Sequence, residues 1–296
     1  MRYSFTMMQR LQVLNGFAIK VMAMVFMTMD HLGIFLMMYA TNDIMSTVGY
    51  VFRCIGRLAF PLFVLLLVEG IRHSKNVPMY VIRIAILAFT IMIAEILIYY
   101  LIDTSIGGVE SPIIDLAVCA TALMLLHRKD KFSFLAIIPI AFVLLATGIS
   151  IFEEVKQVSV IWFPFYIRPS YSLFALLLSI GFYYSYDIVL HKFKNSGIPE
   201  EDIKQTSYYR SLVSLSQIAT LVTVNIFIYV MSVISVNGKE IFDLYNAAVQ
   251  TWSIAALIFL AMYNGKRGYN AKWFKYGCYL YFPVHIVVIF LIFQLL

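Results

Sequence analysis

The sequence predicts an all-α integral membrane protein, a polytopic bundle of about nine transmembrane helices. Of its 296 residues, 62% are hydrophobic and 13% are charged, whereas soluble domains are typically about half apolar and about a quarter charged. A soluble fold of this size could not hide so much apolar surface. The apolar residues also form long runs separated by short basic loops, and many of the 20 Tyr stand at the ends of those runs, as is typical of a membrane–water interface.

The apolar runs define the elements, because a spanning helix needs about 20 mostly apolar residues. The predicted spans are residues 17–39, 57–72, 79–102, 112–126, 133–152, 171–191, 211–236, 246–263 and 274–295. Val48–Cys54 is expected to be a short interfacial helix that leads into the second span. The first run is too long for a signal peptide and is followed by no A-x-A site, so it is expected to be retained. With no internal repeat and no soluble segment, residues 1–296 are predicted to form a single transmembrane domain.

The basic residues give the spans a direction. With a cytoplasmic amino terminus, most of the 22 Lys and Arg fall in inside segments, as the positive-inside rule requires. The outside segments keep Arg53, Arg57, Lys156, Arg168 and Lys239. This alternation predicts an odd number of spans and a carboxyl terminus outside. Because the charges of the +6 chain lie in short loops, they predict orientation against membrane lipid and not a nucleic-acid partner.

Several kinds of site are not predicted. The three cysteines, Cys54, Cys119 and Cys278, lie in apolar segments without a C-x-x-C pair, which gives neither a disulfide framework nor a zinc site. The His and acidic residues of the spans include ligands of suitable type, but no H-x-x-x-H or H-E-x-x-H spacing exists, so no metal is predicted. There is also no G-x-S-x-G elbow and no Walker loop.

Ionisable residues within the spans are the candidates for function, because a charge in the bilayer is costly unless it is paired or hydrated. These residues are Asp30, His31, Arg57, Glu69, Glu95, Asp115, Asp187 and His285. The predicted topology places Glu69 and Asp187 near the inner interface and the other six in the outer half. Two histidines with carboxylates and an arginine can build an acid–base site.

Structural alternatives stay open for several of these residues. Asp30 and Arg57 could neutralise each other as a structural pair, and Glu69 could pair with Arg72 or Arg83. Pro283, two residues before His285, could bend its helix and turn the imidazole toward the bundle, or it could be a tolerated kink.

Three strings of residues resemble the TraX family of membrane proteins. The first is Ile19-Lys20-Val21-Met22-Ala23-Met24 with Met29-Asp30-His31-Leu32-Gly33. The second is Ile55-Gly56-Arg57-Leu58-Ala59-Phe60-Pro61-Leu62-Phe63 with Glu69-Gly70, Tyr80 and Arg83. The third is Asn264-Gly265-Lys266-Arg267-Gly268 with Lys272-Trp273 and Tyr281-Phe282-Pro283-Val284-His285. Between about 110 and 245 the resemblance is mainly one of hydrophobic pattern.

The resemblance implies a membrane acetyltransferase. The family's named member acetylates the amino terminus of the F-pilin subunit in conjugative bacteria. The chain is also similar to wider transmembrane acyltransferases, such as heparan-α-glucosaminide N-acetyltransferase, which share a histidine at the first helix. His31 stands in a matching place. The resemblance therefore implies acetyl-CoA as donor, a pilin amino terminus or a cell-surface glycan as acceptor, and a bacterial plasma membrane as location.

A mechanism follows from the resemblance as a hypothesis. Acetyl-CoA would enter from the cytoplasm with its phosphates near Arg72, Lys75 and Arg83. Asp30 would orient His31, which would deprotonate the acceptor. Arg57 or His285 would stabilise the oxyanion. Glu95, Asp115 and Glu69 would complete the polar cluster.

Two other classes of function are compatible with the same residues. The ionisable residues could line the path of a transporter or channel with a proton relay, although no inverted repeat is seen. The chain could also be a membrane scaffold for the assembly of surface appendages, with a purely structural polar cluster.

Overall fold

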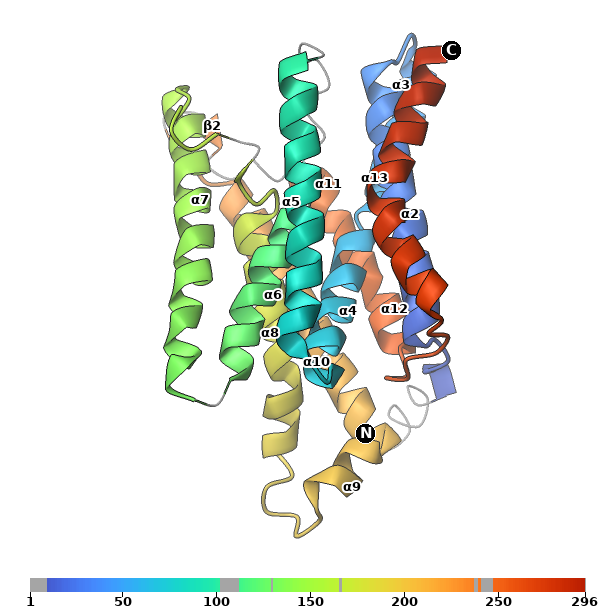
Figure 1. Cartoon of the computed structure of the whole chain (residues 1–296), viewed down its shortest axis with the longest axis vertical. Helices are drawn as coiled ribbons and strands as arrows, with labels where there is room; N and C mark the ends of the chain where they lie inside the picture. Colours follow the sequence, from blue (N-terminus) through green and yellow to red (C-terminus); the bar gives the residue numbers. More distant parts are fainter. Residues whose placement is uncertain are drawn as a thin grey trace. The chain divides into compact units, whose positions relative to one another are not determined.

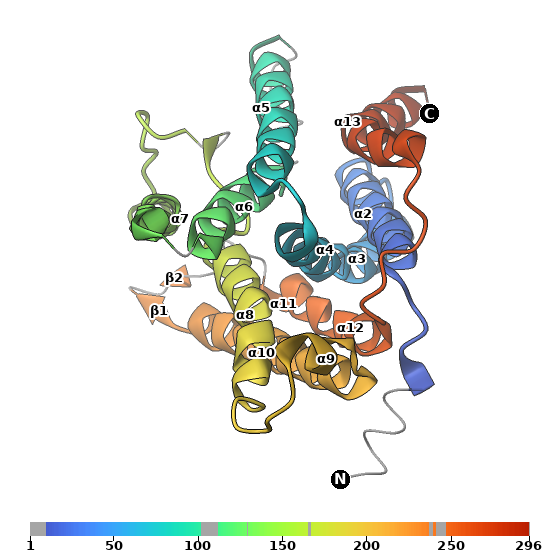
Figure 2. The ribbon, with the colours of Figure 1, turned by 60° about the horizontal axis from the view of Figure 1, so that its bottom comes forward.

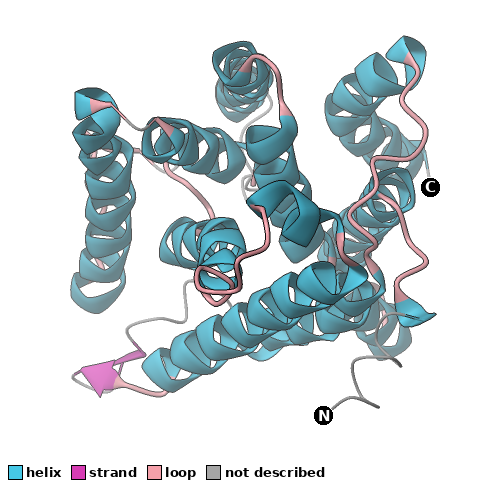
Figure 3. Ribbon diagram, turned by 90° about the horizontal axis from the view of Figure 1, so that it is seen from below, coloured by secondary structure: helices cyan, strands magenta, loops and turns pink. Residues whose placement is uncertain are grey.

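The computed structural model describes residues 10–101, 112–128, 130–164, 167–236, 239–240 and 247–295. The described part of the chain is almost entirely helical (Figure 3). It also contains a two-residue antiparallel pair, β1 (Ser235–Val236) with β2 (Lys239–Glu240), and an isolated bridge between Leu14 and Tyr263. The helical fold class predicted from the sequence is confirmed.

Seven helical segments of the described chain are long and apolar enough to cross a membrane. They are Gly16–Met38, Asp43–His73, Val77–Ala94, Lys131–Lys156, Ser172–His191, Ser207–Ser232 and Lys272–Leu295. The two other predicted spans, 112–126 and 246–263, correspond to shorter apolar helices, Ile113–His127 and Thr251–Met262. The chain is therefore a multi-pass membrane protein. The count of nine and the cytoplasmic amino terminus stay predictions.

The helices follow the predicted spans closely at most ends. Their bounds are α2 (Gly16–Met38), α3 (Asp43–Gly56), α4 (Ala59–His73), α5 (Val77–Leu101), α6 (Ile113–His127), the 3-10 helix η1 (Lys131–Ala136), α7 (Ile137–Lys156), α8 (Ser172–His191), α9 (Glu200–Gln205), α10 (Ser207–Ser232), α11 (Ala247–Gln250), the 3-10 helix η4 (Thr251–Ala256), α12 (Leu257–Met262) and α13 (Lys272–Leu295). The predicted span 211–236 lies about one turn too late, because α10 starts at Ser207 and its carboxyl end gives way to the β1–β2 pair.

The prediction of a short interfacial helix at Val48–Cys54 is wrong in extent. These residues lie inside α3, which begins where the Asn42 side chain accepts a hydrogen bond from the Met45 N–H at 2.8 Å. Such an N-cap satisfies a backbone donor that the first turn leaves unpaired. With α4, the helix forms the segment Asp43–His73, long enough to cross a membrane.

The chain divides into two compact units that interleave in sequence. The first comprises residues 1–66, 180–225 and 252–296, and the second comprises residues 67–179 and 226–251. Helices α4, α8 and α10 each contribute residues to both. Each unit is described by itself below, and the interpretation of residues 1–296 as one domain stays a prediction.

In the first unit, α2 and α3 pack closely through glycines. A Cβ atom on Gly49 would lie 2.9 Å from the Gly33 carbonyl oxygen, and one on Gly56 would lie 2.3 Å from the Asp30 Cβ. Small residues allow two helix backbones to approach in this way within a membrane. The contacts pair later residues of α3 with earlier residues of α2, so the two helices run antiparallel and bring Asp30 beside the end of α3.

Helix α13 packs along α2 in the parallel direction (Figure 1). Contacting pairs, in order along both helices, are Thr28 with Tyr281, His31 with His285, Phe35 with Phe293, and Tyr39 with Gln294. Each loop between spans reverses the direction of the chain, so two spans run parallel only if an even number of loops lies between them. A helix that is parallel to the first span is therefore an odd-numbered span. The observed pairing therefore supports the predicted odd count.

Several helices expose unbroken apolar stripes. On α5 the stripe is Ile82, Ile86, Phe89 and Ile93, and on α13 it is Leu280, Val284, Val287 and Leu291, each of them 40% exposed or more. The spacing of three or four residues puts each set on one helix face. Water does not stabilise such a surface, whereas lipid does, so these stripes are membrane-facing surfaces.

Candidate active site

His31 of α2 and His285 of α13 meet inside the first unit. The Nδ1 atom of His31 lies 2.7 Å from the Nε2 atom of His285, and the two side chains belong to residues only 5% and 6% exposed. The histidines are 254 positions apart in sequence. The parallel packing of the first and last long helices is therefore what creates the pair.

The hydrogen bonds of the pair assign its protons. His285 Nδ1 lies 2.7 Å from the carbonyl oxygen of Tyr281, one turn earlier in α13. A carbonyl only accepts, so this nitrogen carries a proton and donates. The Nε2 atom of neutral His285 then accepts a hydrogen bond from the N–H at Nδ1 of His31. His31 is left with its Nε2 lone pair available, which is the state that a general base needs.

The ring of His285 is held from a second side by Tyr281. The two rings stack with centroids 4.9 Å apart and planes 5° apart. The Tyr281 hydroxyl is itself hydrogen-bonded to the Thr28 hydroxyl of α2. Pro283, between Tyr281 and His285, lies inside α13 and has no N–H to donate to the carbonyl four residues before it. The ring and the carbonyl of Tyr281 thus hold the imidazole in the orientation that the pair requires.

Asp30, next to His31, faces two arginines. Its Oδ1 atom lies 3.5 Å from the Nε atom of Arg53 and 3.5 Å from that of Arg57. The three side chains are 10 to 20% exposed, and together they carry one net positive charge. The predicted pairing of Asp30 with Arg57 is present. By contrast, the hypothesis that Asp30 orients His31 is not supported, because the His31 Nδ1 atom contacts His285.

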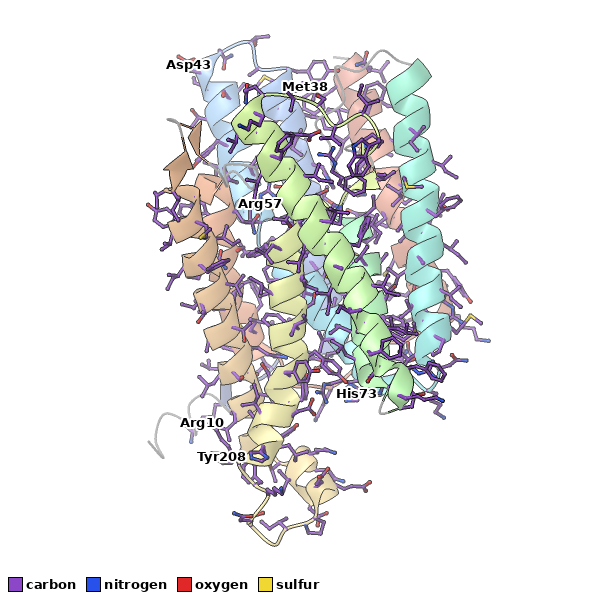
Figure 4. All side chains as sticks on the ribbon, turned by 90° about the vertical axis from the view of Figure 1, so that its left-hand side faces the viewer. Arg10, Met38, Asp43, Arg57, His73 and Tyr208 are labelled. Carbon is purple, nitrogen blue, oxygen red and sulfur yellow. The ribbon has the colours of Figure 1, made fainter. Side chains whose placement is uncertain are left out.

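Arg57 lies at a break between two helices and not at the start of a span, where the sequence predicts it. Helix α3 ends at Gly56 and α4 begins at Ala59, so Arg57 stands near the middle of the segment Asp43–His73. Figure 4 shows it between the level of Arg10 and that of Met38 and Asp43. A span that starts at residue 57 would put Arg57 at one end of the helix. In the first unit it lies instead well away from both ends. The preceding Gly56 leaves room for Asp30 at this point.

Asp115, predicted to join the polar cluster, lies in the second unit in a different role. Its carboxylate accepts hydrogen bonds from the backbone N–H groups of Ser170, Tyr171 and Ser172, at 2.7 to 3.1 Å. These groups lead into α8, and the residue is 1% exposed. A carboxylate at a helix amino terminus satisfies donors that the helix leaves unpaired and complements its dipole. The Asp115 side chain therefore holds α6 to the start of α8.

The remaining predicted site residues also belong to the second unit. Glu69 Oε2 lies 3.1 Å from His73 Nδ1, and the Tyr80 ring covers Gly70 of the same turn. Around this α4–α5 turn, Arg72 and Arg83 are half-buried and Lys75 is exposed. Glu95 lies on α5, but its side chain is outside the described part of the chain. The contact of Arg72, Lys75 and Arg83 with the phosphates of acetyl-CoA stays a prediction.

Two residues of the site are not predicted from the sequence as members of it. Arg53 was placed in an outside loop, although it stands four residues before Arg57 and therefore on the same helix face, a signal that could have revealed it. Tyr281 belongs to the third resembling string, and the sequence predicts no role for it in the site. Its role depends on the contact of α13 with α2, which no local pattern indicates.

The geometry defines a multi-pass membrane protein with a buried histidine pair beside an arginine–aspartate cluster. Comparison with known families specifies it further. The model of the family described as TraX protein matches residues 15–187, more than half of the chain, so the chain belongs to the TraX family. The match includes Asp30, His31 and Arg57, while the third resembling string, residues 264–285, lies beyond it. No curated protein and no solved structure matches the chain.

Proposed function

We propose that this protein is a membrane-embedded acetyltransferase that moves an acetyl group from acetyl-CoA to an amine or hydroxyl, in the bacterial plasma membrane. Membership of the TraX family, which is associated with F-pilin acetylation, supports the class of reaction. The observation that carries the proposal is the buried hydrogen bond between His31 and His285. It leaves one imidazole nitrogen ready to accept a proton where water is largely excluded.

In the proposed reaction, His31 Nε2 takes the proton of the acceptor amine or hydroxyl as it attacks the thioester carbonyl carbon. A C–N or C–O bond forms, and the C–S bond then breaks. The coenzyme A thiolate leaves and takes the proton back from His31, so the base is regenerated. His285 orients the His31 imidazole and shares the positive charge that His31 carries between the two proton transfers.

Arg57 is the better candidate for the oxyanion of the tetrahedral intermediate, because His285 is engaged with His31. Asp30 contacts Arg57 and Arg53 together and so positions a cluster with one positive charge in excess. Such a preorganised cation stabilises negative charge far better in a dry site than in water. The proposed acceptor is a pilin amino terminus or a cell-surface glycan, as the resemblance implies.

The test is acetyl transfer by protein purified into lipid nanodiscs, followed as coenzyme A release and as incorporation of labelled acetyl into membranes of the host. His31→Ala should lower turnover by about 10²- to 10⁴-fold, the contribution of a general base. His191→Ala, an exposed histidine at the end of α8, is the matched control and should keep the wild-type rate. Wild-type turnover in His31→Ala, or none in the unmodified protein, would overturn the proposal.

His285 acts through His31 as a positioning residue, so its variants should differ in a graded way. His285→Ala should lower turnover by about 10- to 100-fold, the equivalent of one hydrogen bond to a charged group. His285→Gln should recover part of that loss, because its amide oxygen can accept from His31 Nδ1. Equal rates in the two variants would contradict the orienting role and leave that of His31 standing.

A further inference from the structure

Helix α10 buries a row of polar side chains on one face in the first unit. Arg210, Ser214, Gln217 and Asn225 recur at intervals of three, four or eight residues, which places them on the same side of the helix. Ser214 and Gln217 are 0% exposed, Asn225 is 3% and Arg210 is 9%. Polar residues in a spanning segment are retained where they line a path or bind a ligand.

Within the described part of the chain, Ser214 and Gln217 differ from their polar neighbours. The Ser214 hydroxyl and both polar atoms of the Gln217 amide have no hydrogen-bond partner there. Asn225, by contrast, donates to the Leu221 carbonyl and accepts from the Ser253 hydroxyl, both at 2.9 Å. A buried polar group without a partner costs folding free energy that an apolar side chain would not. The two orphaned side chains could therefore be satisfied by a polar molecule that binds against this face.

One end of this face is basic. The Arg210 guanidinium lies over the Tyr263 ring at 4.4 Å and donates to the Tyr186 hydroxyl at 2.8 Å. The loop after Tyr263 passes alongside, because a Cβ on Gly265 would lie 3.1 Å from Arg210 Cδ. The backbone carbonyls of Lys266 and Arg267 in this loop accept from the first N–H groups of α2. Three cationic residues thus belong to the same end of the first unit.

The same unit links this face to the histidine pair. Tyr263, which follows α12 directly, contacts Arg210 of α10, and Phe259 of α12 contacts Phe26 of α2, with ring centroids 5.4 Å apart. Figure 2 shows α12 between α2 and α10. Phe26 stands about one turn before His31 on α2. The orphaned side chains and the proposed base are therefore joined through one short helix.

We propose that the α10 face formed by Arg210, Ser214 and Gln217 binds the pantetheine arm of the acyl-coenzyme A donor, an inference that rests on the proposed function. A glutamine side chain offers one acceptor and two donors, which matches the N–H and C=O of a secondary amide, and the arm contains two. The rise from Arg210 to Gln217 is about 10 Å at 1.5 Å per residue. An extended arm covers that distance, with its phosphates toward Arg210, Lys266 and Arg267.

The experiment measures binding of coenzyme A and of pantetheine, which lacks the nucleotide, to the full chain in nanodiscs by calorimetry, together with the melting temperature with and without ligand. Gln217→Leu keeps the volume and removes the amide, and Ser214→Ala removes the hydroxyl. Both should weaken binding of coenzyme A and of pantetheine, Gln217→Leu by about tenfold or more. The melting temperature without ligand should stay the same or rise, since no internal hydrogen bond is lost.

Ser216→Ala, beside Gln217 on a partly exposed position, is the matched control and should bind as the unmodified protein does. Unchanged affinity in both test variants would overturn the assignment of this face while leaving the acetyltransferase proposal intact. A fall in the ligand-free melting temperature with unchanged affinity would do the same, because it would show a structural role. No binding of coenzyme A by the unmodified protein would overturn both proposals.

Discussion

Each ring nitrogen of the histidine pair has a distinct task. The Nδ1 of His285 donates to the Tyr281 carbonyl, and this fixes the tautomer of His285. His31 then carries its proton on Nδ1, which leaves its Nε2 without one. In many acid–base sites a carboxylate orients the imidazole. Here a second imidazole does so, and the neighbouring carboxylate of Asp30 holds two arginines instead. A neutral partner adds no charge to a site within the membrane, where an additional charge is costly.

Asp115 shows how an ionisable residue in a spanning segment can be structural. Asp115→Ala would leave the backbone N–H groups of Ser170, Tyr171 and Ser172 without their acceptor, so we expect a loss of about 3 kcal/mol or more in the free energy of unfolding. Asp115→Asn keeps one acceptor oxygen and should lose less. Thermal unfolding in detergent measures both.

Asp202→Asn, on the exposed helix α9, is the control for this pair and should unfold as the unmodified protein does. Coenzyme A release per folded molecule should be unchanged in Asp115→Asn. An Asp115→Ala protein with an unaltered melting temperature would contradict the structural role.

At the scale of elements, the contact between α2 and α3 sets the position of the charged cluster. A Cβ on Gly56 would overlap the backbone of Asp30, so the aspartate lies directly against the end of α3 and within reach of Arg53 and Arg57. Helix packing of this kind depends on the absence of a side chain. The local pattern around Arg57 could suggest a pair with Asp30, but only the close approach of the helices adds Arg53.

Gly56→Ala tests that contact. Its Cβ would lie 2.5 Å from the Asp30 Cα, so the helices must separate, and overpacking of this kind costs about 1 to 3 kcal/mol. We expect a lower melting temperature and a lower rate of acetyl transfer, because Asp30 moves away from Arg57.

Gly277→Ala on α13 is the matched substitution, since nothing lies within 4 Å of the added Cβ. Alanine in a helix interior is favoured over glycine by about 0.5 to 1 kcal/mol, so this variant should be as stable as the unmodified protein or more so. Equal stability of the Gly56 and Gly277 variants would show that α2 and α3 can separate without cost.

At the scale of the whole molecule, the parallel pairing of α2 with α13 bears on topology. The distribution of Lys and Arg predicts an odd number of crossings, and the ordered contacts from Thr28–Tyr281 to Tyr39–Gln294 require the two helices to run in the same direction. These two arguments are independent, because one uses the charges of loops and the other the packing of apolar helices.

Single cysteines test the predicted orientation. In a variant with Cys54, Cys119 and Cys278 replaced by alanine, Thr41→Cys lies between α2 and α3, and Ser196→Cys lies between α8 and α9. A membrane-impermeant maleimide should label the cysteine at 41 in intact cells and the cysteine at 196 only after permeabilisation. Labelling of the cysteine at 196 alone in intact cells would refute a cytoplasmic amino terminus. Labelling of both cysteines would contradict the predicted number of spans between them.

The sequence by itself determined the membrane class, most helix positions and the residue types of the site. Composition, run length and loop charge are local quantities, and lipid imposes strong constraints on all three. The sequence also predicted a role for Asp30, His31, Arg57 and His285, because an ionisable side chain within the membrane costs free energy that an apolar one does not.

Only the tertiary structure decided which of these residues meet. His31 and His285 are joined by the packing of two helices from opposite ends of the chain, and Arg53 is added by a glycine contact. The orphaned Ser214 and Gln217 are known as such only from their surroundings. Partnership between distant side chains depends on distance and direction in space, and neither quantity is written in the local pattern of residues.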